Sequence, residues 1–450
     1  MGASVAIVDP GPLGGLCILR GCMPSKTLIA TGDLMQEIRE AGVLGVRANE
    51  PRIDFRAMME RKREVIQGFA DYRIEGLETF PIVTGHARFI SERELQVGND
   101  VVSAKSFIIG TGSVIAPPVV PGLEETGYID SDAALDLDRP PRSLLVLGGG
   151  YVAVELGQFF SRIGIPTTMI IRAKHLLSTA DTDVGETLTR ELREEGIRIV
   201  TAAQMLRAER AGERKRLVYR RPDGESSVEA DEIFYALGRI PNLEGLELEK
   251  AGVVAHPVKG IEVDATMRTS NPRIFAVGDV TGEYLLVHVA IQQGEIAARN
   301  AVLEGRATID YTLSKTHTIF SDPQVAIAGE TEKTLRAAGT PFLKASYPFA
   351  DHGKAISIGK TKGFVKMLAA PHDGRILGVQ IIGADASDLI HEAIVAMHFK
   401  ATVFDFVRIP HLHPTMAEIL TYPAEELVLE IEGARKAALR GDLPVAASVP

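Results

Sequence analysis

Cysteine is almost absent from this chain of 450 residues, in which Cys17 and Cys22 are the only two. Two thiols cannot complete a four-ligand zinc site without histidines from elsewhere. A disulfide between them would close so small a loop that it would stabilise a large domain little. They are better interpreted as a redox pair that opens and closes, although the spacing alone leaves two ordinary buried thiols or half of a metal site as alternatives.

A net positive charge and long apolar runs are also lacking. The formal net charge is -10, so the composition gives no indication of the basic surface that displaces counterions from nucleic acid. No stretch reaches the roughly 20 apolar residues of a membrane-spanning helix, and the start lacks a charged region followed by an apolar one. We therefore expect a cytoplasmic protein with no nucleic acid or membrane as partner, in a reducing compartment where a dithiol can cycle.

Length and composition indicate several folded domains. The chain is long enough for about three domains of roughly 150 residues each. Its 45% hydrophobic and 24% charged residues are ordinary for globular proteins. The end differs, because a run rich in Ala, Gly and Pro from about Gly433 to Pro450 predicts a loose tail.

A dinucleotide-binding unit is predicted in the middle of the chain. The apolar run 143–147 is typical of a buried parallel strand and leads directly into Gly148-Gly149-Gly150-Tyr151-Val152-Ala153. The first and third glycines and the small alanine let the backbone approach a pyrophosphate at the N-terminus of a helix. Such a glycine pattern is weak alone, but a helix to about Gly164 and a second strand over 168–171 supply the expected context.

The remaining pattern predicts the rest of the architecture. Val184, Leu188 and Leu192 form one stripe of a helix, and a strand at 197–200 continues the α/β alternation over about 117–245. Beyond about residue 309, turn residues and alternating strands predict an antiparallel sheet with packing helices. The predicted fold class is α/β, with a doubly wound dinucleotide-binding domain and a C-terminal α+β domain, and the family resemblance described next implies a second doubly wound dinucleotide-binding domain.

Two segments carry a family resemblance. They read Gly14-Gly15-Leu16-Cys17-Ile18-Leu19-Arg20-Gly21-Cys22-Met23-Pro24-Ser25-Lys26 and His411-Leu412-His413-Pro414-Thr415-Met416-Ala417-Glu418. Both resemble segments of the FAD-dependent pyridine nucleotide-disulfide oxidoreductases, the family of dihydrolipoamide dehydrogenase, glutathione reductase and mercuric reductase. The resemblance runs from about residue 3 to about residue 426. It implies an FAD-binding domain over 1–116 and 246–308, an NAD(P)-binding domain over 117–245, and a dimerisation domain over 309–450 that includes the loose tail.

The start of the chain departs from that family. Residues 2–9 look like the second strand of the flavin-binding unit, with Asp9 as its acidic ribose-binding residue. The first strand, glycine-rich turn and helix of such a unit do not precede it. We expect this to leave a gap in the middle of the parallel sheet. Either the true start codon lies upstream, or the chain is a decayed copy that no longer holds flavin.

The resemblance assigns a direction to each cysteine. Cys22 would face the flavin, and Cys17 would exchange with a disulfide or dithiol substrate. Lys26, with Glu155 as its partner, would lie at the reactive nitrogen of the flavin, where a positive charge favours the reduced ring. Leu16 replaces the threonine common in the family, so one polar contact to the flavin is in doubt.

The second segment implies an acid and base. Thiol exchange needs a group that takes and returns a proton, and His413, oriented by Glu418, would supply it. In the family this histidine acts on the cysteines of the other subunit, which implies a homodimer. His411 lacks the following Pro-Thr and is treated as secondary.

The family also implies which residues bind the cofactors. On the flavin side they are Asp9, Lys26, Ala87, Thr111, Gly112, Ser113, Asp279, Leu286 and His288. On the nucleotide side they are Gly148, Gly150, Tyr151, Glu155, Arg172 and Gly238. Arg172, helped by Lys174 or His175, suits the phosphate of NADPH, so we expect NADPH in preference to NADH.

The substrate is less defined than the chemistry. The Pro24-Ser25-Lys26 ending and the context of His413 favour a function like that of dihydrolipoamide dehydrogenase, whereas Tyr151 and Arg172 favour glutathione reductase. Mercuric reductase is disfavoured because the extra cysteines that deliver the metal are missing. The alternative from another class is a nucleotide-binding dimer without flavin or catalysis.

Overall fold

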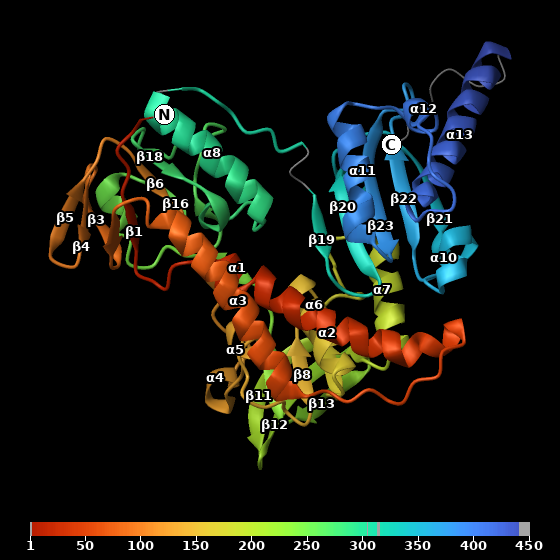
Figure 1. The fold of residues 1–450 in the computed structure, drawn as a ribbon, viewed down its shortest axis with the longest axis horizontal. Coiled ribbons are helices and arrows are strands. Elements are labelled where there is room, and N and C mark those ends of the chain that lie inside the picture. Colours follow the sequence, from red (N-terminus) through yellow and green to blue (C-terminus); the bar gives the residue numbers. More distant parts are fainter. Residues whose placement is uncertain (1, 304, 313–315, 441–450) are drawn as a thin grey trace. The chain divides into compact units, whose positions relative to one another are not determined.

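The computed structural model describes residues 2–303, 305–312 and 316–440, and Figure 1 shows its ribbon. The chain forms two compact units. The first runs to residue 35 and adds 52–172 and 202–311, and the second contains 36–51, 173–201 and the residues from 312 onward. The domain boundaries expected from the sequence remain a prediction.

The first unit contains most of the strands. Its helices are α1 (Leu16–Arg20), α2 (Cys22–Glu40, which continues into the second unit), α3 (Phe55–Leu77), α4 (Leu123–Thr126), α5 (Ser131–Ala134), α6 (Tyr151–Arg162) and α8 (Val287–Leu303), with short 3-10 turns η2 (Leu248–Ala251) and η3 (Gly278–Thr281). Its strands are β1 (Ile7–Asp9), β2 (Ile82–Thr84), β3 (Ala87–Ser91), β4 (Glu94–Val97), β5 (Asp100–Ser103), β6 (Phe107–Ile109), β7 (Ser113–Ile115), β8 (Leu144–Leu147), β9 (Thr167–Ile170), β11 (Gln204–Ala211), β12 (Arg214–Arg221), β13 (Gly224–Ala230), β14 (Glu232–Tyr235), β15 (Arg239–Pro241), β16 (Ala255–His256), β17 (Gly260–Ile261) and β18 (Ile274–Ala276).

The second unit is built around one antiparallel sheet. Its helices are α7 (Thr182–Glu194), α9 (Glu332–Ala337), α10 (Gly353–Ile358), α11 (Ala386–His398), α12 (Val403–Phe406) and α13 (Thr421–Arg440), with turns η1 (Ala41–Leu44), η4 (Phe349–Asp351) and η5 (Ala417–Leu420). Its strands are β10 (Arg198–Val200), β19 (His317–Ile319), β20 (Gln324–Gly329), β21 (Leu343–Pro348), β22 (Phe364–Ala369) and β23 (Ile376–Gly383). None of the helices in the described part of the chain combines the length and apolar content needed to cross a membrane.

The predicted dinucleotide unit forms around strand β8. All four of its residues are buried, and it lies between β9 and β14 in parallel pairing. Gly148 follows with φ +130, and a Cβ there would lie 2.4 Å from the carbonyl oxygen of Ala236. Only glycine therefore permits these two backbone segments to approach so closely. Gly150 is the N-cap residue of α6, so the helix begins directly after the glycine turn. Local sequence and packing therefore agree on a strand, glycine turn and helix.

An antiparallel meander interrupts this unit. Strands β11, β12 and β13 pair in that order between β10 and β14 of the chain, and no sequence pattern predicted them. Their charged residues face one another across the strands, as in the pairs of Arg216 with Glu209 and Glu229. An antiparallel ribbon with many charged residues shows little alternation of apolar and polar residues, so the sequence pattern did not indicate these strands.

The flavin-side part of the first unit contains two separate parallel pairs. One pair is β1 with β2, and the other is β6 with β18. Among the described residues no strand joins them into one sheet. The core behind β6 and β18 is dense, with Phe89 and Phe107 edge to face at 5.5 Å. The two pairs are thus separate among the described residues, and the gap expected between them stays a prediction.

The antiparallel sheet of the second unit has the strand order β19-β20-β23-β22-β21. Helices α11 and α13 cover it, as Figure 1 shows. The buried cluster between sheet and helices includes Val365, Met367, Ile381, Ile390 and Leu427. The C-terminal sheet with packing helices, predicted from the sequence, is therefore observed.

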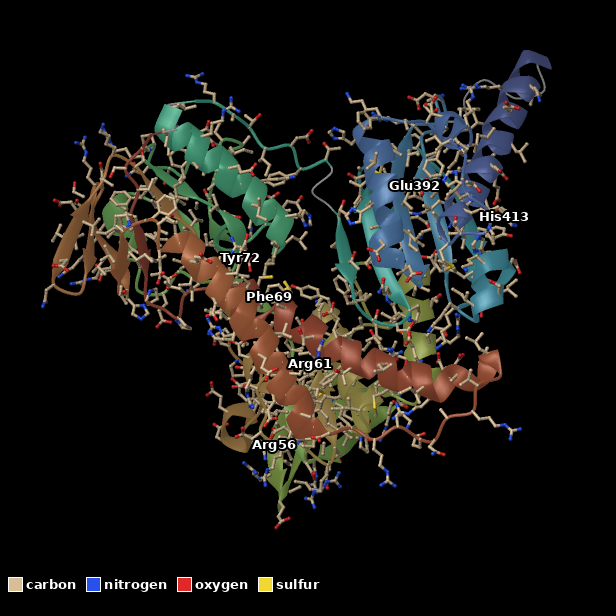
Figure 2. The ribbon with its side chains drawn as sticks, in the orientation of Figure 1. Arg56, Arg61, Phe69, Tyr72, Glu392 and His413 are labelled. Atoms are coloured by element: carbon tan, nitrogen blue, oxygen red, sulfur yellow. The ribbon has the colours of Figure 1, made fainter. Side chains whose placement is uncertain are left out.

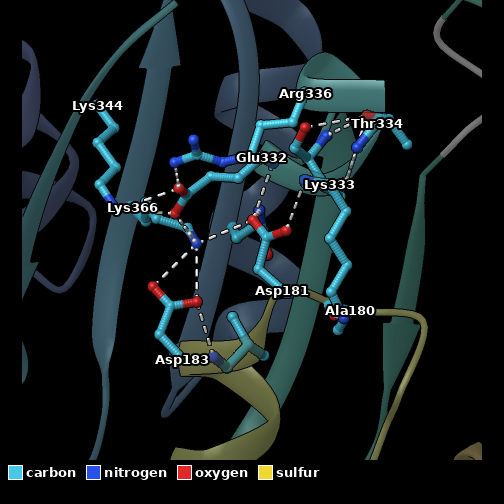
Figure 3. Close-up of polar contacts among 12 residues, drawn as sticks. Ala180, Asp181, Asp183, Glu332, Lys333, Thr334, Arg336, Lys344 and Lys366 are labelled. Atoms are coloured by element: carbon cyan, nitrogen blue, oxygen red, sulfur yellow. Dashed lines mark hydrogen bonds and ion pairs between the residues drawn. The ribbon is translucent and has the colours of Figure 1, made fainter. Parts of the chain in front are cut away.

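A fully buried lysine lies at one edge of this core. Lys366 on β22 is 0% exposed, and its Nζ lies 2.9 Å from Asp181, 2.8 Å from Asp183 and 3.0 Å from Glu332 (Figure 3). Asp181 precedes α7 but caps a different helix, because its carboxylate accepts the backbone N–H groups of Glu332 and Lys333. The cluster thus ties the start of α7 to the sheet and to α9.

One expectation about the chain end was wrong. Residues from Gly433 were predicted to be a loose tail, but α13 continues to Arg440. A single glycine costs a helix only about 1 kcal/mol, and the residues that follow it are good helix formers. Arg435 also donates to the carbonyl of His372 and stacks over Phe404 at 5.0 Å. Residues 441–450, where the rest of that tail was predicted, lie outside the described residues.

Candidate active site

The two cysteines lie at a break between helices. Cys17 belongs to α1, and Cys22 is the first residue of α2. Gly21 between them allows a close turn, since a Cβ there would lie 3.0 Å from the carbonyl oxygen of Leu16. Both cysteines are free thiols and half-buried, and the thiol of Cys17 donates to the sulfur of Cys22. The pair is thus close enough to act as one redox centre.

The electrostatics distinguish the two sulfurs. The hydrogen bond from Cys17 lowers the pKa of Cys22 to about 6, against the effect of burial and with help from Lys26. Cys22 also begins a long helix, where the positive end of the dipole favours a thiolate. Conversely, the hydrogen bond to Cys22 and burial raise the pKa of Cys17. In the reduced pair, Cys22 therefore holds the negative charge and Cys17 holds the proton.

Lys26 lies one turn along α2 and forms an ion pair with α6. Its Nζ is 2.7 Å from the carboxylate of Glu155, which is 5% exposed. Arg162 on the same helix pairs with Asp33 at 2.5 Å, so α2 and α6 are joined twice. The association of Lys26 with Glu155, expected from the family, is thus present in the structure.

A second group of polar residues gathers around Asp279. Its carboxylate accepts a hydrogen bond from the Ser113 hydroxyl at 2.6 Å. Arg239 donates to the same hydroxyl at 3.0 Å and to the Ser113 carbonyl at 2.9 Å. Tyr151 lies in the same electrostatic neighbourhood, because burial and the charge of Asp279 raise its pKa while Arg239 lowers it.

Arg239 and its neighbour Asp132 were missed from the sequence. Asp132 lies 4.0 Å from Arg239 and 3.5 Å from Arg20, and burial raises its pKa despite both arginines. The signal for Arg239 was available, since it directly follows Gly238, which the family resemblance implies for the nucleotide side. Asp132 had no signal, because an acidic residue in a short helix is normally solvent-exposed.

Other predicted cofactor residues lie on turns and element ends. Thr111 donates to the carbonyl of Asn242 at 2.8 Å, and Gly112 follows with φ +71. Asp9 ends β1 and accepts the backbone N–H of Gly11 at 2.7 Å. The remaining ones are Ala87 at the start of β3, Leu286 just before α8, exposed His288 in its first turn, exposed Arg172 after β9, and Gly238 with φ +125. The roles of these residues in binding cofactors stay predictions.

The histidine and carboxylate pair forms in the second unit. His413 Nδ1 lies 2.9 Å and 3.0 Å from the two carboxylate oxygens of Glu418, and this hydrogen bond lowers the pKa of Glu418. The side chain of His413 is 75% exposed, and Figure 2 labels it near the start of α13. An exposed imidazole held by a carboxylate at Nδ1 presents Nε2 for proton transfer.

A partly buried group of rings lies near this pair. Tyr422 stacks on Tyr347 at 4.1 Å, and the ring of His352 meets Tyr422 edge to face at 6.1 Å. His352 is 1% exposed and burial lowers its pKa, so it is a neutral ring at physiological pH. The charge of Glu418 opposes that shift, which places His352 within electrostatic reach of the carboxylate.

The residues around Cys22 suit the flavin end of FAD. Lys26 supplies a fixed positive charge, and Ser113 and Asp279 supply a hydroxyl and a carboxylate of the kind that hydrogen-bond a polyol chain. In the described chain a strand, glycine turn and helix of the dinucleotide-binding type are β8, Gly148–Gly150 and α6.

Together these features define a class of protein. A cysteine pair with one acidic sulfur, beside a dinucleotide-binding unit and followed by an α+β sheet domain, belongs to an oxidoreductase that exchanges electrons with disulfides.

Comparison with known proteins identifies the family. The model of the pyridine nucleotide-disulphide oxidoreductases matches residues 1–294, and the model of their dimerisation domain matches residues 316–424. The chain therefore belongs to this family, and both the resemblance and the mixed α/β fold class are confirmed. It is a flavoprotein oxidoreductase that uses FAD and a pyridine nucleotide and has a redox-active disulfide.

Similar proteins carry different names. Dihydrolipoyl dehydrogenase of Geobacillus stearothermophilus is 34% identical over 94% of this chain and 91% of its own length. Mercuric reductase of Bacillus cereus is 31% identical over 96% of this chain and 68% of its own length. Among solved structures, the HOCl-induced flavoprotein disulfide reductase RclA of Escherichia coli matches with a TM-score of 0.83 and 26% identity over 94% of each chain.

Proposed function

We propose that this protein passes electrons between NAD(P)H and a disulfide or dithiol substrate through FAD and the Cys17–Cys22 pair, as a homodimer. The observation that carries the proposal is the separation of charge within the pair, with an acidic Cys22 and a protonated Cys17. Residues 1–116 with 246–308 would hold FAD, 117–245 the nicotinamide nucleotide, and 309–450 the subunit interface.

In this proposal the two sulfurs act in sequence. Cys17 loses its proton and attacks one sulfur of the substrate disulfide, and the other substrate sulfur leaves as a thiol. The thiolate of Cys22 then attacks Cys17 in the mixed disulfide, which releases the second substrate thiol and forms the Cys17–Cys22 disulfide. FAD, when bound, relays the two electrons from the nicotinamide that return the pair to its dithiol state.

A base is needed because the pKa of Cys17 is raised. His413 of the partner subunit would accept this proton at Nε2, while the Glu418 carboxylate at Nδ1 of the same ring supports its charged form. Lys26 would hold its positive charge beside the thiolate of Cys22 and the flavin, with Glu155 fixing the ammonium group in place. Ser113 and Asp279 would hold the ribityl chain.

Among substrates we favour a lipoyl group, so that the activity is like that of dihydrolipoyl dehydrogenase. The first relative described above carries that name, and the exposed His413–Glu418 pair suits a thiol substrate. A glutathione reductase-like activity is the second candidate, favoured by Tyr151 at the start of α6. We favour NADPH over NADH because Arg172 is exposed two residues after the end of β9, with Lys174 two residues further on.

One substrate panel tests the proposal. Lipoamide, glutathione disulfide and Hg²⁺ are each assayed with NADH and with NADPH on FAD-loaded protein, with dihydrolipoamide and NAD⁺ or NADP⁺ for the reverse direction. We expect the largest kcat/KM with a lipoyl substrate and NADPH. A larger kcat/KM with glutathione or mercury would refute the lipoyl assignment, and colourless folded protein would refute the flavin-dependent function altogether.

A variant tests the base. His413→Gln should slow reaction with the disulfide by about 10² to 10⁴-fold, while reduction of the flavin by the nucleotide stays within about twofold in stopped-flow absorbance. Exposed His398 at the end of α11 provides the matched control, and His398→Gln should change neither step. Equal loss in both steps for His413→Gln would contradict an acid and base role.

A further inference from the structure

A second histidine pairs with a carboxylate two residues before His413. His411 Nε2 lies 2.5 Å from Glu392 on α11, and His411 Nδ1 lies 2.9 Å from the carbonyl oxygen of Ile409. The side chain is 8% exposed, and its ring packs against Phe406 with centroids 5.4 Å apart. Sequence reasoning had treated this histidine as secondary.

The contacts of His411 leave its ring no freedom. A carbonyl oxygen can only accept, so Nδ1 carries a proton and donates to Ile409. His411 Nε2 lies against the Glu392 carboxylate, whose oxygens accept hydrogen bonds. Both ring nitrogens are therefore committed, and this ring, unlike that of His413, offers no nitrogen for proton exchange with a substrate.

The pair holds the loop that carries His413. Between the end of α12 and the start of η5 the chain has no regular structure, and Leu412 and the side chain of His413 are 78% and 75% exposed. Thr415 bonds to Leu412 within the same loop. The side-chain bond from the loop to a neighbouring long helix is that of His411 with Glu392, which Figure 2 labels on α11.

We propose that the His411–Glu392 pair is a positioning device for His413, which fixes the acid and base by clamping its loop to α11. The inference rests on the proposed function of His413. Only Leu412 separates the two histidines in the chain. A loop released at His411 would therefore let the His413 ring move away from the sulfur with which it exchanges a proton. A displacement of about 1 Å at a reacting group can cost about 10²-fold in rate.

The experiment measures both half-reactions for single and double variants. We expect His411→Gln and Glu392→Leu each to slow reaction with the lipoyl disulfide by about 10- to 100-fold, as loss of a supporting hydrogen bond does elsewhere. Reduction of the flavin by nucleotide should stay unchanged in both. Glu392→Gln keeps an acceptor oxygen and should recover most of the rate. His391→Gln, an exposed histidine beside Glu392 in sequence, is the matched control.

The decisive comparison is made without His413. If His411 acts through His413, adding His411→Gln to His413→Gln should cause no further loss, whereas a general structural defect would reduce the rate again by the same factor. A further loss in the double variant, or a rate within about twofold of wild type for His411→Gln, would overturn the inference. If His413→Gln is itself without effect, the proposed function fails instead, so the two failures are distinguishable.

Discussion

Lys366 provides the prediction that depends least on assumptions about catalysis. Lys366→Met keeps much of the side-chain volume but removes the buried charge that faces Asp181, Asp183 and Glu332. Removing one partner of a buried ion pair typically costs about 3 to 5 kcal/mol because the remaining charge is left uncompensated. That is about a hundred-fold to a few thousand-fold in the equilibrium between the intact and opened cluster.

The matched control is on the same carboxylate. Lys344 lies 3.1 Å from Glu332 but its side chain is 51% exposed, so water screens the pair. Lys344→Met should cost no more than about 1 kcal/mol. The contrast between two lysines that contact one glutamate isolates the effect of burial.

The loss of stability in Lys366→Met should depend on pH. Hydrogen bonds from Gln380 and Lys366 hold the pKa of Asp181 below its ordinary value although burial would raise it, and Lys366, Arg336 and Lys344 do the same for Glu332. Carboxylates with lowered folded pKa values stabilise above their unfolded pKa and lose that contribution as the pH falls. Without the lysine, burial raises both pKa values instead. The variant should thus be most destabilised near pH 8 and approach wild type near pH 4.

Hydrogen exchange measures this locally. The amides of Glu332 and Lys333 donate to Asp181, so peptides covering them report the opening of the cluster. We expect faster exchange there in Lys366→Met at pH 8 and a much smaller excess, after correction for intrinsic rates, at pH 5. Unchanged protection at pH 8, or an excess that does not depend on pH, would refute the electrostatic argument.

Three more outcomes are expected. In the reduced enzyme, thiolate absorbance should titrate with a midpoint near the pKa of Cys22, about 6, so the thiolate is present above that pH and lost below it. Cys22→Ser should remove this transition. A midpoint above about pH 8 would contradict the assignment. Gly148→Ala should abolish binding of NADPH measured by fluorescence, because its Cβ would lie 2.4 Å from a backbone oxygen, while FAD content stays unchanged; normal binding would count against the turn. Lys26→Met should lower the midpoint potential of the bound flavin measured by spectroelectrochemistry, since it removes a positive charge that favours the reduced ring, and an unchanged or higher potential would place Lys26 outside the flavin site.

Several parts of this molecule were predictable from local sequence. Leu144–Leu147 and Gly148 predicted a buried strand and a turn that requires glycine, and both are observed. The stripe of Val184, Leu188 and Leu192 predicted α7, and all three residues are buried. These signals are local, because burial on both faces or along one stripe leaves a periodic pattern in the chain itself.

Other parts carried no local signal. The meander β11–β13 is rich in charged residues paired across strands, so it lacks an apolar alternation. The end of α13 was misjudged because its glycine and small residues resemble a linker, although the same alanines favour a helix. Asp132 became a candidate site residue only when folding brought it to Arg20 and Arg239.

By itself, the sequence indicated the redox chemistry, because the segments around Cys17 and Cys22 and around His413 resemble those of the disulfide oxidoreductases. Only the tertiary structure decided what surrounds that pair and its proposed base. Lys26 meets Glu155 from a helix more than a hundred residues away, His411 meets Glu392 on another helix, and Lys366 meets three carboxylates in the core. The physical reason is that a charge has no period along the chain, and its partner is chosen by the fold that makes its burial tolerable.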